Sequence, residues 1–311
     1  MIHFFSYRKQ GLKAALTLFA VLSVQPALAA SEKTADRATL AGLVPHKALY
    51  DITLVSNSNS SHFQNLSGQM FYQWQPGCEA WLSNHRFNMV YEYIDVPAMR
   101  ITSDYSTYEP FDGKSMTFTS QRRRDGELFE ETRGSAQLGS DEKRPEAVFT
   151  IPEGLSFALS ENTLFPMAHT LEVLDQIRAG KKFFRSTIFD GSDKEGPMQV
   201  TTFVGKPVET AELLNVAAGI DDKLLRGKAW NIRLAFFPLN TDDPGSDYEM
   251  SVVFHENGII GDITIEYHDF SVSQKLVALE NMENACNAKD GKKQETRKEA
   301  PVKPDHSVKK P

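Results

Sequence analysis

Cysteine is almost absent from this sequence, which has only Cys78 and Cys286 among its 311 residues. There is no C-x-x-C pair, and two thiols are too few for a structural zinc site. The histidines form no H-E-x-x-H motif, and no G-x-S-x-G motif marks a serine hydrolase. These absences argue against redox, zinc and serine-hydrolase chemistry, so we expect no catalytic residues, no metal ligands and no cofactor.

Long hydrophobic runs are also lacking, except near the N-terminus. There, Arg8, Lys9 and Lys13 precede a short apolar run over residues 14–24, and small residues follow at 27–29. This pattern predicts a cleaved signal peptide over residues 1–29. The run is too short to span a membrane comfortably, and no comparable run follows it, so we do not expect a membrane-spanning protein. For a Gram-negative source the expected location is the periplasm, where disulfides persist.

Basic charge is scarce in the central part of the chain. Residues 30–287 contain 23 basic and 37 acidic residues, a net charge of −14, which argues against nucleic-acid binding. The tail over residues 288–311 has eight basic and four acidic residues and almost nothing apolar to bury. We expect it to be a disordered, solvated terminus, although its charge would also suit anionic envelope polymers or lipid headgroups.

Alternating apolar and polar residues dominate the body of the chain. This period of two predicts strands with one buried and one wet face, and Asp112-Gly113, Asp125-Gly126 and Asn257-Gly258 fit tight turns between them. We expect an all-β fold with one domain over residues 43–287, after a linker at 30–42. The runs with this pattern include HKALYDITLVS, SGQMFYQW, KSMTFTSQ, MQVTTFVG, YEMSVVFH and DITIEYHDFSV.

One segment, FPMAHTLEVLDQIRAGKK, has a helical pattern instead. Pro166 suits a first helical turn, Gly180 suits the end, and apolar residues recur between them at spacings of three and four. We therefore expect one amphipathic helix that packs on the sheet or across a barrel mouth.

The two cysteines lie near the beginning and the end of the predicted β domain. An oxidising compartment and an even cysteine count favour a structural disulfide between Cys78 and Cys286. Two free thiols, or a redox role, remain the alternatives. A bridge over this separation would stabilise the fold by about 5 kcal/mol in the chain-entropy model.

Five segments together resemble the EipB family of cell-envelope integrity proteins. They are LVPHKALYDITLVS, LSGQMFYQWQPGCEAW, FDGKSMTFTSQ, LFPMAHTLEVLDQIRAG and ENACN, and they span residues 43–286. The opening V-P-H-[KR]-A-x-Y-D and the helix start F-P-x-x-H-T are specific as a pair. The resemblance implies a periplasmic protein with a spiral-like, incompletely closed antiparallel barrel, a helix packed on it and a disulfide between Cys78 and Cys286. It also implies a role in maintaining the envelope, and it supplies no catalytic residues.

Four residues are candidates for a partner or ligand surface. His46 precedes the first strand, and His169 falls in the first turn of the helix; each also suits a purely structural position. Arg122 and Arg124 precede the Asp125-Gly126 turn and could grip an anionic headgroup, although a solvated hairpin end explains them as well.

Two classes of function fit these patterns. The first is a non-enzymatic envelope protein that binds a periplasmic protein partner or an apolar, lipid-like ligand. The second is a hydrolase acting on peptidoglycan or lipid. Because no catalytic constellation is visible, the binding protein is favoured.

Overall fold

The structure is a computed structural model that describes residues 42–58, 63–139, 144–208, 219–239 and 245–283. All of these residues belong to one compact unit, Thr34–Pro311. The predicted signal peptide, the basic tail and Cys286 lie outside the described residues. No helix of the described part is both long and apolar enough to cross a membrane.

Strands make up most of the described chain, with one α-helix and one short 3-10 helix among them. The first half contains β1 (His46–Asn57), β2 (Asn65–Pro76), β3 (Ala80–Glu92), β4 (Met99–Pro110), β5 (Ser115–Arg124), β6 (Glu127–Gln137), β7 (Glu146–Ile151) and β8 (Ser156–Ala158). The second half contains β9 (Thr163–Leu164), α2 (Pro166–Arg178), β10 (Phe183–Ile188), β11 (Met198–Val208), β12 (Gly219–Ile220), η1 (Asp222–Leu225), β13 (Ala229–Pro238), β14 (Tyr248–His255), β15 (Ile260–Tyr267) and β16 (Phe270–Asn281).

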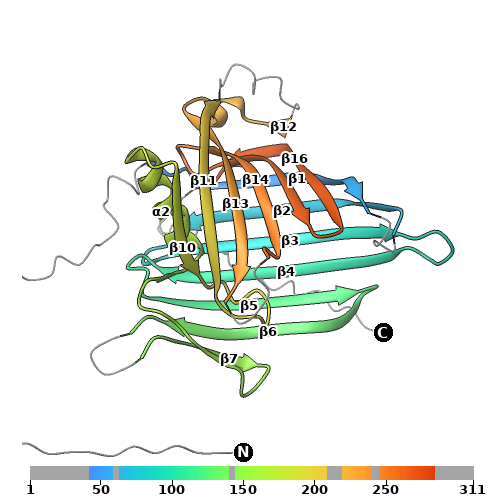
Figure 1. The fold of residues 1–311 in the computed structure, drawn as a ribbon, viewed down its shortest axis with the longest axis horizontal. Helices are drawn as coiled ribbons and strands as arrows, with labels where there is room; N and C mark the ends of the chain where they lie inside the picture. The colour runs from blue at the N-terminus through green and yellow to red at the C-terminus, as the bar shows by residue number, and fades with distance from the viewer. Residues whose placement is uncertain (1–41, 59–62, 140–143, 209–218, 240–244, 284–311) are drawn as a thin grey trace, which may run out of the picture. The chain divides into compact units, whose positions relative to one another are not determined.

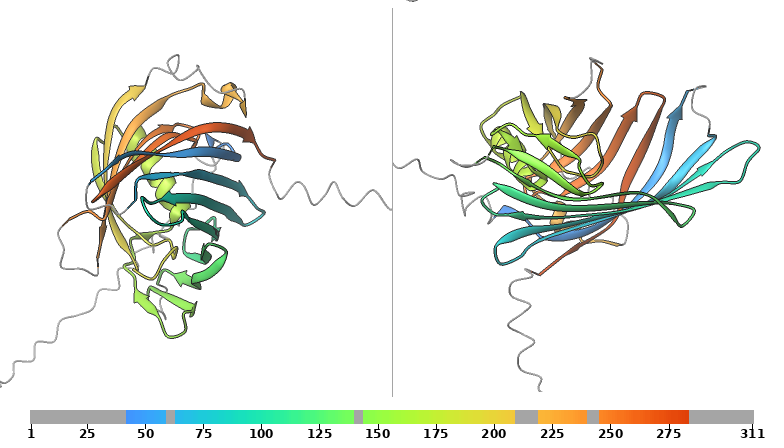
Figure 2. Two further views of the ribbon diagram at one scale, coloured as in Figure 1. Left: turned by 90° about the vertical axis from the view of Figure 1, so that its right-hand side faces the viewer. Right: turned by 90° about the horizontal axis from the view of Figure 1, so that it is seen from below.

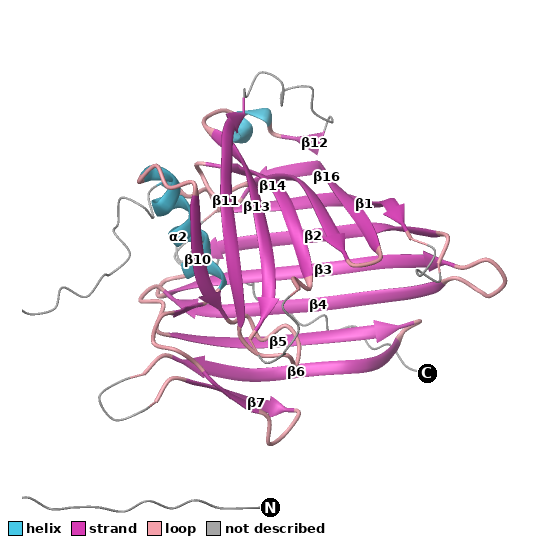
Figure 3. Ribbon diagram, in the orientation of Figure 1, coloured by secondary structure: helices cyan, strands magenta, loops and turns pink. Residues whose placement is uncertain are grey.

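The strands form a single sheet that is not closed into a barrel (Figures 1 and 3). Its order is β8-β7-β6-β5-β4-β3-β2-β1-β16-β15-β14-β13-β11-β10-β9, with β12 added beside β16. Antiparallel pairs build most of each half, β9 and β12 pair in parallel with β10 and β16, and pairing of β1 with β16 joins the halves. The gap falls between β8 and β9, which are neighbours in sequence. The predicted incompletely closed all-β architecture is confirmed.

Alternation along each strand separates an inner from an outer face. In β5, Met116, Phe118 and Ser120 are buried, whereas Thr117 is exposed and Thr119 half-buried. We call the buried side, against which α2 packs, the inner face.

The sheet curls strongly around α2 (Figure 2). Gly68 in β2 and Gly134 in β6 mark two points where neighbouring strands approach closely. A Cβ at Gly68 would lie 2.3 Å from the carbonyl oxygen of Asn88, and one at Gly134 would lie 2.4 Å from that of Val148. Only glycine permits such an approach, so these positions allow bends that a flat sheet lacks.

The predicted helix is confirmed and lies in the core. Pro166 is its first residue, and Gly180, with φ of 75°, follows its C-cap. Its apolar stripe packs into one large core cluster with both halves of the sheet, including Trp74 of β2 and Leu276 of β16. The buried residues of the stripe are Met167, Leu171, Val173, Leu174 and Ile177.

A second, smaller core lies at the β5–β7 part of the sheet. Phe118 of β5 and Phe149 of β7 pack edge-to-face with ring centroids 4.9 Å apart, and Phe189, just after β10, joins them. The segment after β10 is thus tied to the opposite half of the sheet. Tyr105 donates its hydroxyl hydrogen bond to the Asp190 carbonyl at 2.7 Å, and Thr132 donates to the Gly191 carbonyl at 2.9 Å.

Candidate functional site

The N-terminus of α2 is held by a carboxylate from the sheet. Phe165, the N-cap residue, makes no side-chain cap bond. Instead, Glu109 of β4 accepts hydrogen bonds from the N–H of Met167 at 2.9 Å and the N–H of Ala168 at 2.8 Å. A negative charge suits these unpaired donors and the helix dipole. Glu109 thereby fixes the helix to the inner face.

Burial dominates the acidity of this carboxyl group. Glu109 is 1% exposed, and burial raises its pKa to about 7 despite the opposing effect of the two backbone hydrogen bonds. Both oxygen atoms are engaged by the helix, so the group is committed to holding α2. An acid with a raised pKa is often catalytic, but here the geometry assigns it a structural task.

Beside this cap, a row of rings crosses four adjacent strands of the inner face. His46, Tyr72, His85 and Tyr105 come from β1, β2, β3 and β4, with successive ring centroids 5.6, 4.6 and 5.6 Å apart. Burial raises the pKa of both tyrosines well above the ordinary value and lowers the pKa of both histidines to about 4. At neutral pH the row is therefore uncharged.

His46 lies inside the core and offers no surface to a partner. Its Nδ1 is 2.8 Å from the Val44 carbonyl oxygen and 3.0 Å from Trp74 Nε1, which donates to it. Nδ1 can donate to Val44 or accept from Trp74, so the tautomer selects one of the two bonds. Nε2 is buried without a partner among the described residues. This placement favours the structural role that the sequence also allowed.

His169 lies in the first turn of α2, where burial lowers its pKa to about 4. Its Nε2 is buried and has no hydrogen-bond partner in the described part of the chain. No group of three or more metal-ligating side chains is found in the described ranges. Neither His169 nor His46 is thus placed in a metal centre there.

A second row of aromatic rings lies at the other end of the inner face, which we call the rim row. Neighbouring ring centroids in it are 4.4 to 5.9 Å apart. Tyr267 is 39% exposed, and most of the others are half-buried. The row therefore presents one exposed ring, Tyr267, within a line of partly buried rings that crosses both halves of the sheet. Its members are, in order, Tyr91, Phe63, Phe270, Tyr267, Tyr248 and Phe236.

The two candidate arginines lie on the same side of β5 but have different surroundings. Arg122 is half-buried and bound to Glu130 of β6 at 2.8 Å. Its charge lowers the pKa of Tyr267, opposing the larger effect of burial. Arg124 is exposed at the hairpin tip, 5.1 Å from the centre of the Phe129 ring. The structure brings Arg122 near the rim row, whereas Arg124 stacks on an exposed hairpin.

Cys78 lies in the turn between β2 and β3, and Cys286 lies outside the described residues, so their disulfide stays a prediction. The geometry nearby supports it. His46, at the start of β1, pairs with Trp74 near the end of β2 and with Asn281 at the end of β16. Cys78 and the end of β16, which precedes Cys286 in the sequence, thus lie at the same end of the sheet, two strands apart.

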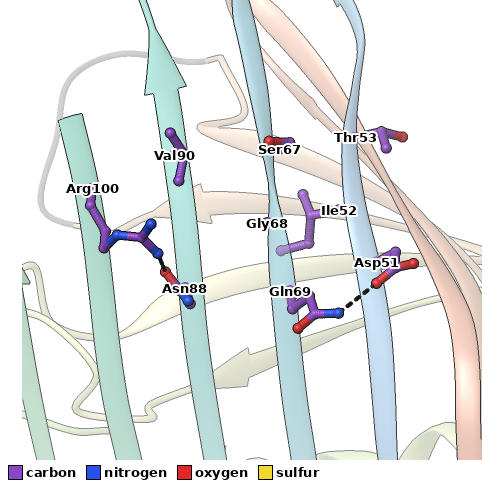
Figure 4. Close-up of a pocket in the computed structure, with 9 residues that line it drawn as sticks. All are labelled: Asp51, Ile52, Thr53, Ser67, Gly68, Gln69, Asn88, Val90 and Arg100. Atoms are coloured by element: carbon purple, nitrogen blue, oxygen red, sulfur yellow. Dashed lines mark hydrogen bonds between the residues drawn. The ribbon is translucent and has the colours of Figure 1, made fainter. Parts of the chain in front are cut away.

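The outer face carries a shallow depression over β1–β4, shown in Figure 4. Its polar side chains already bind one another. Gln69 donates to Asp51 at 2.9 Å, and Arg100 donates to Asn88 at 2.7 Å. The depression is therefore a satisfied polar surface.

Sequence reasoning missed Glu109 and the rim row. A signal for Glu109 was present in the sequence. Strand alternation places it on the same side of β4 as Tyr105 and Thr107, which face inward, so it is an acid on a buried face. The rim row had no local signal, because its rings come from segments that meet only in the folded sheet.

Comparison with known proteins identifies relatives of this chain. The model of the EipB-like family matches residues 37–283. The cell envelope integrity protein EipB of Brucella abortus (strain 2308) is 30% identical over 256 residues, which cover 81% of this chain and 89% of that protein. A crystal structure of a β-barrel-like protein of domain of unknown function DUF1849 from Brucella abortus superposes with a TM-score of 0.71 at 30% identity. That match covers 78% of this chain and 99% of the other.

Proposed function

The chain belongs to the EipB-like family, and from this premise we propose that it is a non-enzymatic periplasmic protein that maintains the integrity of the cell envelope. It does so by binding an apolar, lipid-like ligand or a periplasmic protein partner on the inner face of its open barrel. The name of the Brucella relative supports the envelope role, and the export signal expected from the sequence supports the location.

The observation that carries the binding proposal is the rim row. Aromatic rings contribute large apolar area at low entropy cost, and accessible clusters of them are typical of binding surfaces. Arg122 lies beside the row, and an anionic head of a ligand would compete with Glu130 for its guanidinium. The buried acid that might have served a hydrolase, Glu109, is engaged at both oxygen atoms by α2, which favours binding over hydrolysis.

A deletion strain tests the envelope role. We expect the strain to leak periplasmic enzyme and to become sensitive to detergent, and the full chain supplied in trans should restore both properties. A strain with unchanged leakage and detergent sensitivity would contradict the envelope role.

Substitutions in the rim row test the binding site. The double variant Tyr267→Ser and Phe270→Ser should be exported normally but should restore the deletion strain poorly. Tyr108, on the outer face of β4 and 42% exposed, provides the matched control, and Tyr108→Ser should restore fully. Mass spectrometry of lipids and peptides that co-purify with the chain, but not with the rim variant, would identify the ligand class. Equal restoration by both variants would rule out the rim row as the site.

A further inference from the structure

A basic and aromatic patch lies on the outer face at the β10 edge of the sheet, away from the inner face. Phe183 of β10 and Phe203 of β11 pair directly across the two strands, with ring centroids 5.0 Å apart. They are 48% and 47% exposed, although rings of this size are usually covered. Their outward direction follows from β10 itself, because its next residue, Phe184, packs against the core.

Cations surround this ring pair. Phe183 and Arg185 alternate within β10 and so share its outer side, and the Arg185 guanidinium lies 5.7 Å from the centre of the Phe183 ring. Lys181 lies in the link between α2 and β10, two residues before Phe183, and is exposed. Lys206 follows on β11 and is exposed. We call Lys181, Phe183, Arg185, Phe203 and Lys206 the basic aromatic patch.

The charge of the patch contrasts with that of the rest of the body. Residues 181–185 contain three basic residues and no acidic one, although residues 30–287 carry a net charge of −14. Arg178, just before them, is ion-paired with Asp175. Beyond β11 the next outward cation, Arg233, is neutralised by Glu249 and Glu266. Arg233 lies directly across from Phe203, so the unbalanced positive charge borders the exposed rings on the β10 side.

From this combination we infer that the patch docks the protein on the surface of a phospholipid bilayer with anionic headgroups. Exposed phenylalanines insert at the boundary between headgroups and acyl chains, while lysine and arginine attract anionic lipids. Lysine and arginine side chains also reach the headgroups while their stems cover apolar surface. The inference is independent of the ligand proposed for the rim row, because the patch lies on the other face of the sheet.

The hairpin of β5 and β6 supplies a matched control within the same chain. Phe129 is 47% exposed and lies under the Arg124 guanidinium, so it repeats the ring and cation of the patch. Glu127, Glu130 and Glu131 lie beside it in β6. They offset the three arginines at the end of the paired strand β5. The hairpin thus has an exposed ring and a stacked cation like those of the patch, but without an excess of positive charge.

Sedimentation with vesicles tests the inference. The chain, purified after export to a periplasm, is mixed with vesicles of phosphatidylethanolamine and phosphatidylglycerol (3:1) or of phosphatidylcholine alone. We expect binding to the anionic vesicles only, and weaker binding at high salt. Each cation removed near the surface should weaken binding about fivefold, so Lys181→Ser with Arg185→Ser should lose about 25-fold. Phe183→Ser with Phe203→Ser should lose roughly tenfold or more, whereas Phe129→Ser and Arg124→Ser should bind like the wild type.

Insertion of the ring is measured separately. Phe183→Trp should give a blue-shifted emission and quenching by brominated lipids on anionic vesicles, and Phe129→Trp should give neither. Circular dichroism spectra and melting temperatures are used to check that all variants are folded. The inference is overturned if the wild type does not sediment with anionic vesicles, or if the patch variants bind as tightly as the wild type. It is also overturned if the Phe183→Trp variant binds but its emission stays unchanged, since charge elsewhere would then account for binding.

Discussion

Replacement of Glu109 by glutamine should change how the stability of the protein depends on pH. The pKa of Glu109 is about 7 in the folded chain, against an ordinary value of 4.5. A carboxyl group with a raised folded-state pKa favours the folded state at low pH, and this contribution disappears as pH rises through the folded-state value. Integration of the linkage relation from pH 5 to pH 8 gives a loss of about 2.5 kcal/mol from this one group.

Buried histidines change the pH dependence of stability in the opposite direction. The informative quantity is therefore the difference in unfolding free energy between the wild type and Glu109→Gln. Burial lowers the pKa of His46, His85, His169 and His255 to about 4, and their protonation in the unfolded chain makes stability rise with pH up to about 6.5. These contributions are common to wild type and Glu109→Gln and therefore cancel.

Urea unfolding followed by circular dichroism at pH 5, 6, 7 and 8 provides the measurement. The free energy of unfolding of the wild type minus that of Glu109→Gln should fall by about 2.5 kcal/mol between pH 5 and pH 8. Exposed Glu161, in the turn before β9, gives the control, and Glu161→Gln should follow the wild type. Parallel curves for wild type and Glu109→Gln would refute the argument that Glu109 is buried as an ionisable helix cap.

Three further expectations concern stability. Leu174 of α2 is 1% exposed, so Leu174→Ala should lower the free energy of unfolding, measured with urea, by about 2–5 kcal/mol. The control Glu172→Ala, at a half-buried neighbour, should lower it by less than about 0.5 kcal/mol. A loss below about 1 kcal/mol for Leu174→Ala would mean that the stripe is not a core contact. Trp74→Phe removes the donor to His46 and should cost about 1–3 kcal/mol in the same assay. Cys78→Ser, Cys286→Ser and the double variant should lose equal stability if the two are bridged, and two reactive thiols per denatured, non-reduced chain would show that they are not.

Local patterns predicted most of the fold because alternation and turn chemistry act over a few residues. The turn at Asp125-Gly126 illustrates this: both residues have positive φ, 50° and 90°, and the turn joins β5 to β6 as expected. Pro166 and Gly180 bounded the helix within a residue or two of its ends.

The site was harder to predict because its contacts join distant parts of the chain. Glu109 caps a helix that begins 57 residues later in the chain. The N-cap residue makes no side-chain cap bond, but this alone does not indicate which distant residue accepts the hydrogen bonds of the first helical N–H groups. Phe63 meets Phe270 only because β1 pairs with β16. Nothing in a single sequence encodes that pairing locally, since the register depends on the closure of the whole sheet.

The pairing of β1 with β16 also sets the order in which the protein can assemble. Each half of the sheet is built largely from antiparallel strands near one another in sequence, but His46 pairs with Asn281, 235 positions away. Contacts over such separations form late, because the chain entropy of closing the loop opposes them. In the export that we propose, the N-terminal half would emerge first, and one edge of β1 would stay unpaired until the last strand had crossed the membrane. We therefore expect the nascent protein to depend on periplasmic chaperones that shield β1, and to be cleaved by proteases in this interval when the last strand is removed.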